Sequence, residues 1–288
     1  MSPPALRVRC RQIGSADIDG IVKLLTIGLR PTPDFWVRAF QRLSEHPTPP
    51  GYPKYGYVLE CQDRPVGVVL LIFSSIVVDG EARIRCSNSS WYVEPAFRGY
   101  AGMLRSPAMM HKHVTYFNIS AVPHTWPILE AQGFRRYCDG QFVAVPALCT
   151  QSKRCRVEVA THDISASQDL QSFEIELLLT HAKYGCISVT CSSGDCRHPF
   201  VFLPVWEPLR APKAYLAYCR DLEEFVRFAG PLGRFLAWRG FPLVAVDANG
   251  PIKGLIGRYS DGFPKYFKGP DKPRLADLAY SERVMFRF

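Results

Sequence analysis

The stretch that decides the fold runs from Val93 to Leu104 and reads VEPAFRGYAGML. It follows a long apolar, β-branched run and precedes a segment able to form a helix, which places Gly99 and Gly102 at a strand-to-helix turn. Glycine lets backbone N–H groups approach a ligand closely, and a helix N-terminus adds partial positive charge. The stretch therefore predicts a cradle for a pyrophosphate group, with an ordinary tight turn as the alternative.

The segments before this turn read as one strand, two helices and three strands. Residues 6–13 alternate with the period of a half-buried strand, and Ser15 is placed to cap a helix that Gly28 ends. A second helix is expected from Pro33 to the proline-rich stretch 47–51. Three antiparallel strands in a meander follow, at residues 55–61, 66–78 and 82–93.

The segments after the turn continue with alternating helices and strands. Residues 103–113 predict a helix weakened by Pro107, and residues 114–120 predict a strand. A short helix at 123–132 ends at the pair Gly133 and Phe134, before a last strand that reaches Val145. These elements give an α+β chain with a mixed α/β sheet.

This order, over residues 5–147, resembles the GNAT superfamily of GCN5-related N-acetyltransferases. The acyl-CoA motif of that family reads Val-x-Pro-x-x-Arg-Gly-x-Gly-x-Gly/Ala. Four positions match it here: Val93, Pro95, Arg98 and Gly99. Ala101 and Met103 stand where the family prefers small residues, mostly glycine. Asn118 in the fifth strand and the Gly133–Phe134 pair are further marks of the resemblance.

The resemblance implies the acyl-CoA N-acyltransferase fold, with acetyl-CoA or another acyl-CoA as substrate and no metal. In such enzymes an amine attacks the thioester directly, the pantetheine amide pairs with the fourth strand and the pyrophosphate lies on the glycine turn. Arg98 would add a charge-assisted bond to phosphate. The implied cofactor-binding residues are Tyr92, Val93, Arg98, Gly99, Tyr100, Ala101, Gly102, Met103 and Asn118.

The catalytic groups depart from the family pattern. In many members a tyrosine four residues before the glycine of Gly-Phe acts as the acid. Here this position is Leu129, whose side chain cannot donate a proton. The candidates that remain are Glu94 as base, with Tyr137 or His124 as acid. A solvated glutamate, a sheet tyrosine and a helix-cap histidine are the alternatives. We therefore expect an acyl-CoA-dependent acyltransferase with an unknown acceptor, or a catalytically silent protein that binds acyl-CoA or a protein partner.

The second half of the chain repeats the plan as a degenerate GNAT-like copy. It predicts a strand, a helix, three strands, a helix kinked at Gly230–Pro231 and another apolar strand; no fold is assigned beyond Lys253. We expect two domains, 1–148 and 155–288, joined by a polar and basic linker. Where the second glycine turn should lie, the chain has no glycine and three carboxylates that would repel a pyrophosphate: Asp221, Glu223 and Glu224. Only the first copy is expected to bind a CoA-type ligand.

Composition constrains the remaining classes. The net charge of +9 is shared almost equally by the two halves, so a solvated basic surface is favoured over a nucleic-acid site. The longest apolar run, 66–78, is too short to cross a bilayer, and the first residues carry no secretory pattern, which predicts a cytoplasmic protein.

Ten scattered cysteines predict reduced thiols. Cys191, Cys196 and His198 lack zinc-site spacing and predict a hairpin turn. The oligomeric state is open.

Overall fold

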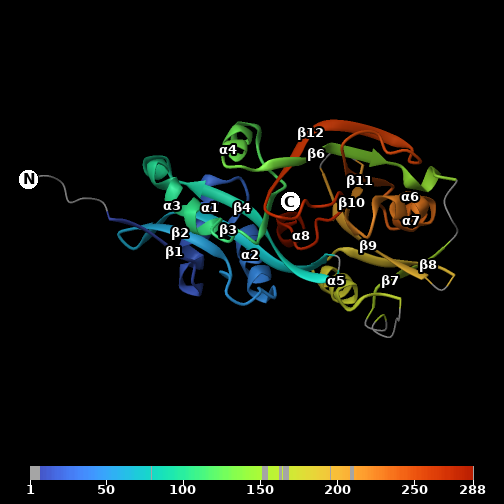
Figure 1. Ribbon diagram of the computed structural model, residues 1–288, viewed down its shortest axis with the longest axis horizontal. Helices are drawn as coiled ribbons and strands as arrows, with labels where there is room; N and C mark the ends of the chain where they lie inside the picture. The colour runs from blue at the N-terminus through green and yellow to red at the C-terminus, as the bar shows by residue number, and fades with distance from the viewer. Residues whose placement is uncertain are drawn as a thin grey trace, which may run out of the picture. The chain divides into compact units, whose positions relative to one another are not determined.

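The chain forms two compact units (Figure 1). The computed structural model describes residues 7–78, 80–150, 155–161, 164, 169–194, 196–207 and 211–287. Unit 1 comprises Met1–Ile119 and Phe267–Lys272. Unit 2 comprises Ser120–Tyr266 and Pro273–Phe288. Each half of the sequence thus contributes residues to both units.

These units differ from the predicted ranges 1–148 and 155–288. The strand β6 (Arg135–Ala144), expected to complete the first domain, belongs to unit 2, where it pairs antiparallel with β11 (Leu243–Ala248). Residues 151–154 of the expected linker lie outside the described residues. The division into these units follows from pairing between strands that lie far apart in the sequence, and local sequence patterns do not predict such pairing.

The sheet of unit 1 has the strand order β1-β2-β3-β4-β5. The first four strands are antiparallel and confirm the predicted meander, while β5 runs parallel to β4. Parallel neighbours need a crossover, and the glycine-bearing turn and a helix supply it. The strands are β1 (Val8–Gln12), β2 (Gly56–Cys61), β3 (Arg64–Val78), β4 (Glu81–Val93) and β5 (Thr115–Asn118).

Two helices, α1 (Ile18–Gly28) and α2 (Pro33–Glu45), join β1 to β2 and bury apolar faces that include Leu25 and Trp36. The predicted cap at Ser15 is wrong. The short helix η1 (Ser15–Asp17) precedes α1, and the Asp17 carboxylate accepts the Gly14 N–H at 2.8 Å. The Arg11 guanidinium of β1 donates to the Asp17 carboxylate at 2.6 Å and holds it there.

His46 closes α2 against the sheet. Its side chain is buried, and Nε2 lies 2.8 Å from the carbonyl oxygen of Phe73 in β3. Burial lowers the pKa of this imidazole below its usual value, and the nearby Lys54 ammonium lowers it further. The folded chain therefore favours the neutral form of His46.

A pH dependence follows from this lowered pKa. The unfolded chain takes up a proton near pH 6.5 whereas folded His46 resists it, so the free energy of unfolding should fall as the pH is lowered from about 7.5 to about 5.5. One proton limits the slope to about 1.4 kcal/mol per pH unit. Urea unfolding across this range should give a flatter curve for His46→Gln, with His124→Gln, at an exposed position, as the control. Parallel curves for wild type and His46→Gln would contradict the assignment.

The sheet of unit 2 has the strand order β12-β6-β11-β10-β9-β8-β7. The strands β7 to β10 are antiparallel and β11 is parallel to β10, which repeats the strand directions of β1 to β5. The β8–β9 hairpin contains the predicted turn. The remaining strands are β7 (Arg156–Val159), β8 (Ile187–Ser193), β9 (Cys196–Val205), β10 (Lys213–Cys219) and β12 (Gly257–Lys268).

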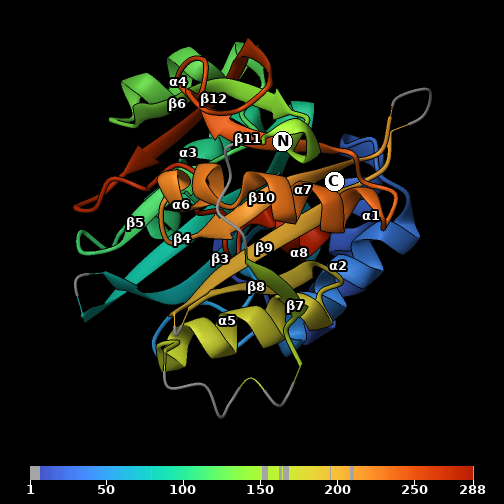
Figure 2. The ribbon, with the colours of Figure 1, turned by 90° about the vertical axis from the view of Figure 1, so that its right-hand side faces the viewer.

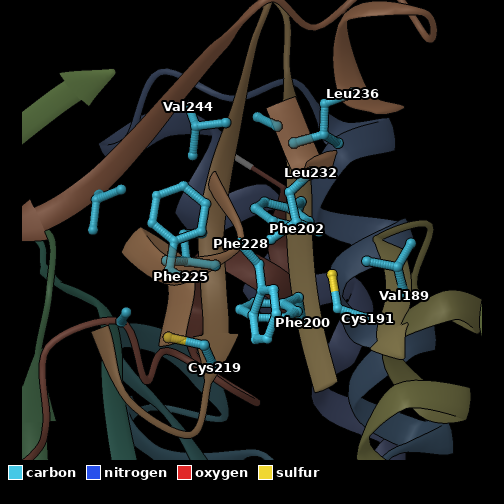
Figure 3. Packing of buried hydrophobic residues seen from close by; sticks show 14 of the residues in the cluster. Val189, Cys191, Phe200, Phe202, Cys219, Phe225, Phe228, Leu232, Leu236 and Val244 are labelled. Atoms are coloured by element: carbon cyan, nitrogen blue, oxygen red, sulfur yellow. The ribbon is translucent and has the colours of Figure 1, made fainter. Parts of the chain in front are cut away.

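The helices α6 (Leu222–Arg227) and α7 (Ala229–Ala237) lie across β9 and β10 (Figure 2). Figure 3 shows their aromatic and leucine side chains packed on Phe200 and Phe202 of β9. The break between the helices falls at Phe228, before the predicted kink, so Pro231 stands in the first turn of α7, where a missing N–H costs little. The helix α5 (Ser172–Lys183) joins β7 to β8, and α8 (Glu282–Phe286) lies near the C-terminus.

A row of polar side chains is buried within the β12-β6-β11-β10 part of this sheet. The Lys265 ammonium donates to both carboxylate oxygens of Asp247 and, at 2.8 Å, to the hydroxyl of Tyr215, which also donates to Asp247. Gln141 donates to the same hydroxyl at 3.4 Å. Burial lowers the pKa of Lys265, and the Asp247 charge opposes that shift. This ion pair ties β12, a segment without a clear apolar pattern, into the sheet.

Removing one partner of this ion pair should be costly. Asp247→Asn leaves a buried ammonium without its counter-charge, and we expect the free energy of unfolding to fall by about 3–5 kcal/mol. The double variant Asp247→Leu with Lys265→Met, which removes both charges, should recover most of that loss in urea titrations. A cost of less than about 1 kcal/mol for the single variant would show that the ammonium reaches solvent.

Candidate functional site

The C-terminal end of β4 runs beyond its parallel partner. The β4–β5 ladder extends from Arg85–Thr115 to Ser87–Phe117, and β5 ends at Asn118, whereas β4 continues to Val93. In the described part of unit 1, residues 88–93 pair through their backbone with β3 alone. The other edge of these residues therefore has no backbone partner among the described residues of unit 1, although Asn88, Ser89 and Val93 are buried.

A β-bulge lies in this free part of β4. The register with β3 shifts between Val68 and Leu70, and Ser90 has φ of 49° in the left-handed region. A non-glycine residue with this backbone is strained, and such bulges re-aim the residues beside a site. Ser89 and Ser90 bond to each other through their hydroxyls at 2.9 Å. The sequence carries no sign of this bulge, because serine is not a left-handed residue by preference.

The stretch 93–104, called the glycine turn below, forms the helices η2 (Pro95–Tyr100) and α3 (Ala101–Ala108). Buried Phe97 and Leu104 anchor it. Gly99 and Gly102 are exposed, neither has a left-handed backbone, and a Cβ atom at either would meet nothing within 4 Å. The packing of the described chain therefore does not require glycine at these two positions, and the bare backbone faces open space.

The electrostatics of the glycine turn suit an anion. The first turns of η2 and α3 contain no acidic residue, and Arg98 is exposed beside Gly99. The acid at the N-cap of η2, Glu94, is paired with the Arg64 guanidinium. The first turn of α6 in unit 2 differs, since it carries Glu223 and Glu224 and is capped by the Asp221 carboxylate, which accepts the Glu223 N–H at 3.1 Å. These acids complement the helix dipole and would repel a phosphate.

The predicted cofactor-binding residues lie together in unit 1. Tyr92 and Val93 end β4 and Asn118 ends β5, while Arg98, Gly99, Tyr100, Ala101, Gly102 and Met103 follow one another in the glycine turn. The ring of Tyr92 packs on Gly28, where a Cβ atom would lie 2.3 Å from the ring. Its side chain thus has a packing role at the end of α1, and its backbone remains the candidate for ligand contact.

The predicted catalytic residues are divided between the units. Glu94 belongs to unit 1, and its carboxylate accepts two bonds from the Arg64 guanidinium at 2.5 and 2.9 Å. This pairing raises the pKa of Arg64. His124, in η3 (Pro123–Thr125), is exposed and Tyr137, in β6, is buried; both belong to unit 2. Sequence reasoning missed Arg64, which lies thirty positions from Glu94 and reaches it only across the β3–β4 pairing.

The helix α4 (Trp126–Ala131) carries Leu129 with its side chain buried. Gly133 ends this helix with φ of 83°, and the Phe134 N–H donates to the Leu129 carbonyl at 3.0 Å. This is a glycine C-cap, so the Gly133–Phe134 pair has a structural role in stopping the helix.

The described residues contain no group of three or more His, Cys, Asp or Glu side chains that could hold a metal ion. Instead, His198 bonds through Nδ1 to Glu224 at 3.0 Å, and Cys191 is buried in the core of unit 2 while Cys196 is exposed. None of the ten cysteines, all of which lie among the described residues, forms a disulfide. Among the described helices, none has the length and apolar character to cross a membrane.

Comparisons with known proteins assign the fold. Neither a protein-family model nor a curated protein matches the sequence. Among solved structures, the GCN5-related N-acetyltransferase of Anabaena variabilis ATCC 29413 matches 95% of this chain and 74% of its own, at a TM-score of 0.61 and 10% identity. The GCN5-related N-acetyltransferase of Kribbella flavida matches 91% of this chain and 71% of its own, at a TM-score of 0.56 and 13% identity. The protein therefore has the GNAT fold, an α+β fold with a mixed sheet.

Proposed function

We propose that the chain is an acyl-CoA-dependent acyltransferase whose ligand site is the glycine turn and the free edge of β4. The observation that carries the proposal is the open space at Gly99 and Gly102. A glycine that the chain's own packing does not need is explained by a ligand that must approach the backbone closely. The residues present thus fit a pyrophosphate, and the edge at 88–93 suits the amide groups of a pantetheine arm.

The proposed reaction is direct transfer of the acyl group. Acyl-CoA supplies an acyl carbon activated as a thioester, and an acceptor amine or other small nucleophile forms a bond to that carbon as the C–S bond breaks. The acceptor must lose a proton and the leaving thiolate gains one. Glu94, beside the end of β4, is the proposed base, with His124 or Tyr137 as proposed acid. The ion pair with Arg64 holds the Glu94 carboxylate in place.

The tandem arrangement belongs to the same proposal. Both units contain four antiparallel strands followed by a fifth strand parallel to the fourth. We take unit 2 as a second, degenerate GNAT-like copy that binds no acyl-CoA, because its glycine-free turn carries the acids Asp221, Glu223 and Glu224. A protein without catalysis that still binds acyl-CoA is the alternative.

Binding of CoA tests the site. Gly99→Glu places a carboxylate against the proposed pyrophosphate position, and calorimetry should show the dissociation constant for CoA rising by about 100-fold or more, near 2.7 kcal/mol. Gly99→Ala is the matched control for the fold, since its Cβ atom meets only open space and the melting temperature should not change. Equal affinity in wild type and Gly99→Glu would overturn the proposal.

Thiol release separates the enzyme from the silent binder. Acetyl-CoA and longer acyl-CoAs would be offered with panels of amine and hydroxyl acceptors, and the wild type should release thiol only with a suitable acceptor. Glu94→Gln should lower kcat by about 100-fold or more and leave the affinity for CoA unchanged, as expected for loss of a general base. CoA binding without thiol release would leave the silent alternative. An unchanged kcat in Glu94→Gln would remove this residue from catalysis.

A further inference from the structure

The end of β10 in unit 2 changes its partner. Its parallel ladder with β11 runs from Lys213–Leu243 to Tyr215–Ala245, but the strand continues to Cys219. Beyond the ladder, β10 bonds to a segment near the C-terminus of the chain. The Cys219 N–H donates to the Ala276 carbonyl at 3.2 Å, the Leu278 N–H donates to the Ala217 carbonyl at 2.7 Å, and an antiparallel bridge joins Tyr218 to Asp277.

This segment, Arg274 to Leu278 and called the capping segment below, is built into unit 2. Ala276 and Leu278 are at most 1% exposed, and Ala276 belongs to the core of β9, β10, α6 and α7. The Arg274 guanidinium donates to the Arg220 carbonyl and to the Asp277 carboxylate, the latter at 3.3 Å. Core packing and charge-assisted bonds thus both hold the segment in unit 2.

The backbone is constrained both within the capping segment and just after it. Ala276 has φ of 58° and Tyr280 has φ of 56°, both in the left-handed region. The Tyr280 N–H donates to Nε2 of His181 at 3.1 Å, and the other ring nitrogen of His181 lies 2.7 Å from the Leu177 carbonyl in α5. Non-glycine residues hold such conformations only where their surroundings enforce them.

The corresponding edge in unit 1, at the end of β4, is not paired in this way by the described residues of that unit. There β4 also outruns its parallel neighbour, after Ser87–Phe117, and residues 88–93 pair with β3 alone within the described part of the unit. The two units thus share strand order and direction but differ at this edge. The edge in unit 1 has no second backbone partner among the described residues of that unit, whereas the edge in unit 2 is paired by the chain itself.

We propose that the capping segment occupies, in unit 2, the strand edge that an acyl-CoA uses in unit 1, so that each chain binds a single acyl-CoA. This inference rests on the proposed function for the identity of the ligand. The bonds at Ala217 and Cys219 satisfy the backbone groups on that edge, so a pantetheine amide would have to displace a buried, covalently tethered competitor. The carboxylates at the start of α6 oppose a pyrophosphate at the same end.

The stoichiometry of CoA binding tests the inference. Calorimetry with the full chain should give a single CoA per chain, and Gly99→Glu should weaken that site by about 100-fold or more and leave no site of the original affinity, with Gly99→Ala as the control for the fold. A second site in the wild type, or a full-affinity site that survives Gly99→Glu, would overturn the inference. No binding by the wild type would instead overturn the proposed function.

Hydrogen exchange tests the cap without reference to the ligand's identity. The amides of Cys219 and Leu278 should exchange slowly in the free protein and be unchanged by saturating CoA, while amides within 88–93 slow down on CoA binding. Rapid exchange at Leu278 in the free protein would show that the edge is open, and exchange there that speeds up on addition of CoA would show that the cap is displaced. Either result overturns the inference even if CoA binds as proposed.

Discussion

The structure depends on one constraint: the backbone groups along the edge of a strand must find partners. In each unit a fourth strand runs beyond the parallel strand beside it, and the end of that strand is left with an unpaired edge. In unit 2 the capping segment pairs this edge, whereas in unit 1 the end of β4 has no second backbone partner among the described residues. The proposed site is thus the one of two equivalent edges that the described residues of its own unit leave unpaired.

Local features surround that edge and make it usable. The bulge at Ser90 bends β4, the anchors Phe97 and Leu104 fix the turn, and the two exposed glycines leave its backbone bare. None of these features forms a pocket for chemistry by itself. The glycine turn also carries the proposed base Glu94, which the Arg64 guanidinium holds in place.

Most elements could be predicted from sequence because their signals are local. The apolar run of β3 and the proline at the start of α2 each act within a few residues. The features that the sequence did not predict depend on contacts between distant segments. Asp17 bonds to Arg11 of β1, and β6 pairs with β11, which lies about a hundred positions later in the chain. Residues beyond Lys253 have no regular apolar pattern in the sequence. A buried ion pair holds β12 in the sheet, and core contacts hold the capping segment. The position of the glycine turn was predictable; the open edge beside it was not.

The contribution of Phe267–Lys272 to unit 1 has a consequence for how the chain is made. Asp271 donates its N–H to the Thr115 hydroxyl at 3.1 Å, and Gly269 lies so close to Thr115 that a Cβ atom would meet its Cα at 2.6 Å. These contacts support the start of β5, the strand beside the proposed site. During synthesis, the ribosome must add some 150 residues after Ile119 before they exist, a delay of roughly 7 to 30 s at ordinary elongation rates. Unit 1 therefore stays incomplete, and the start of β5 lacks these contacts, until residues 120–266 of unit 2 have been made.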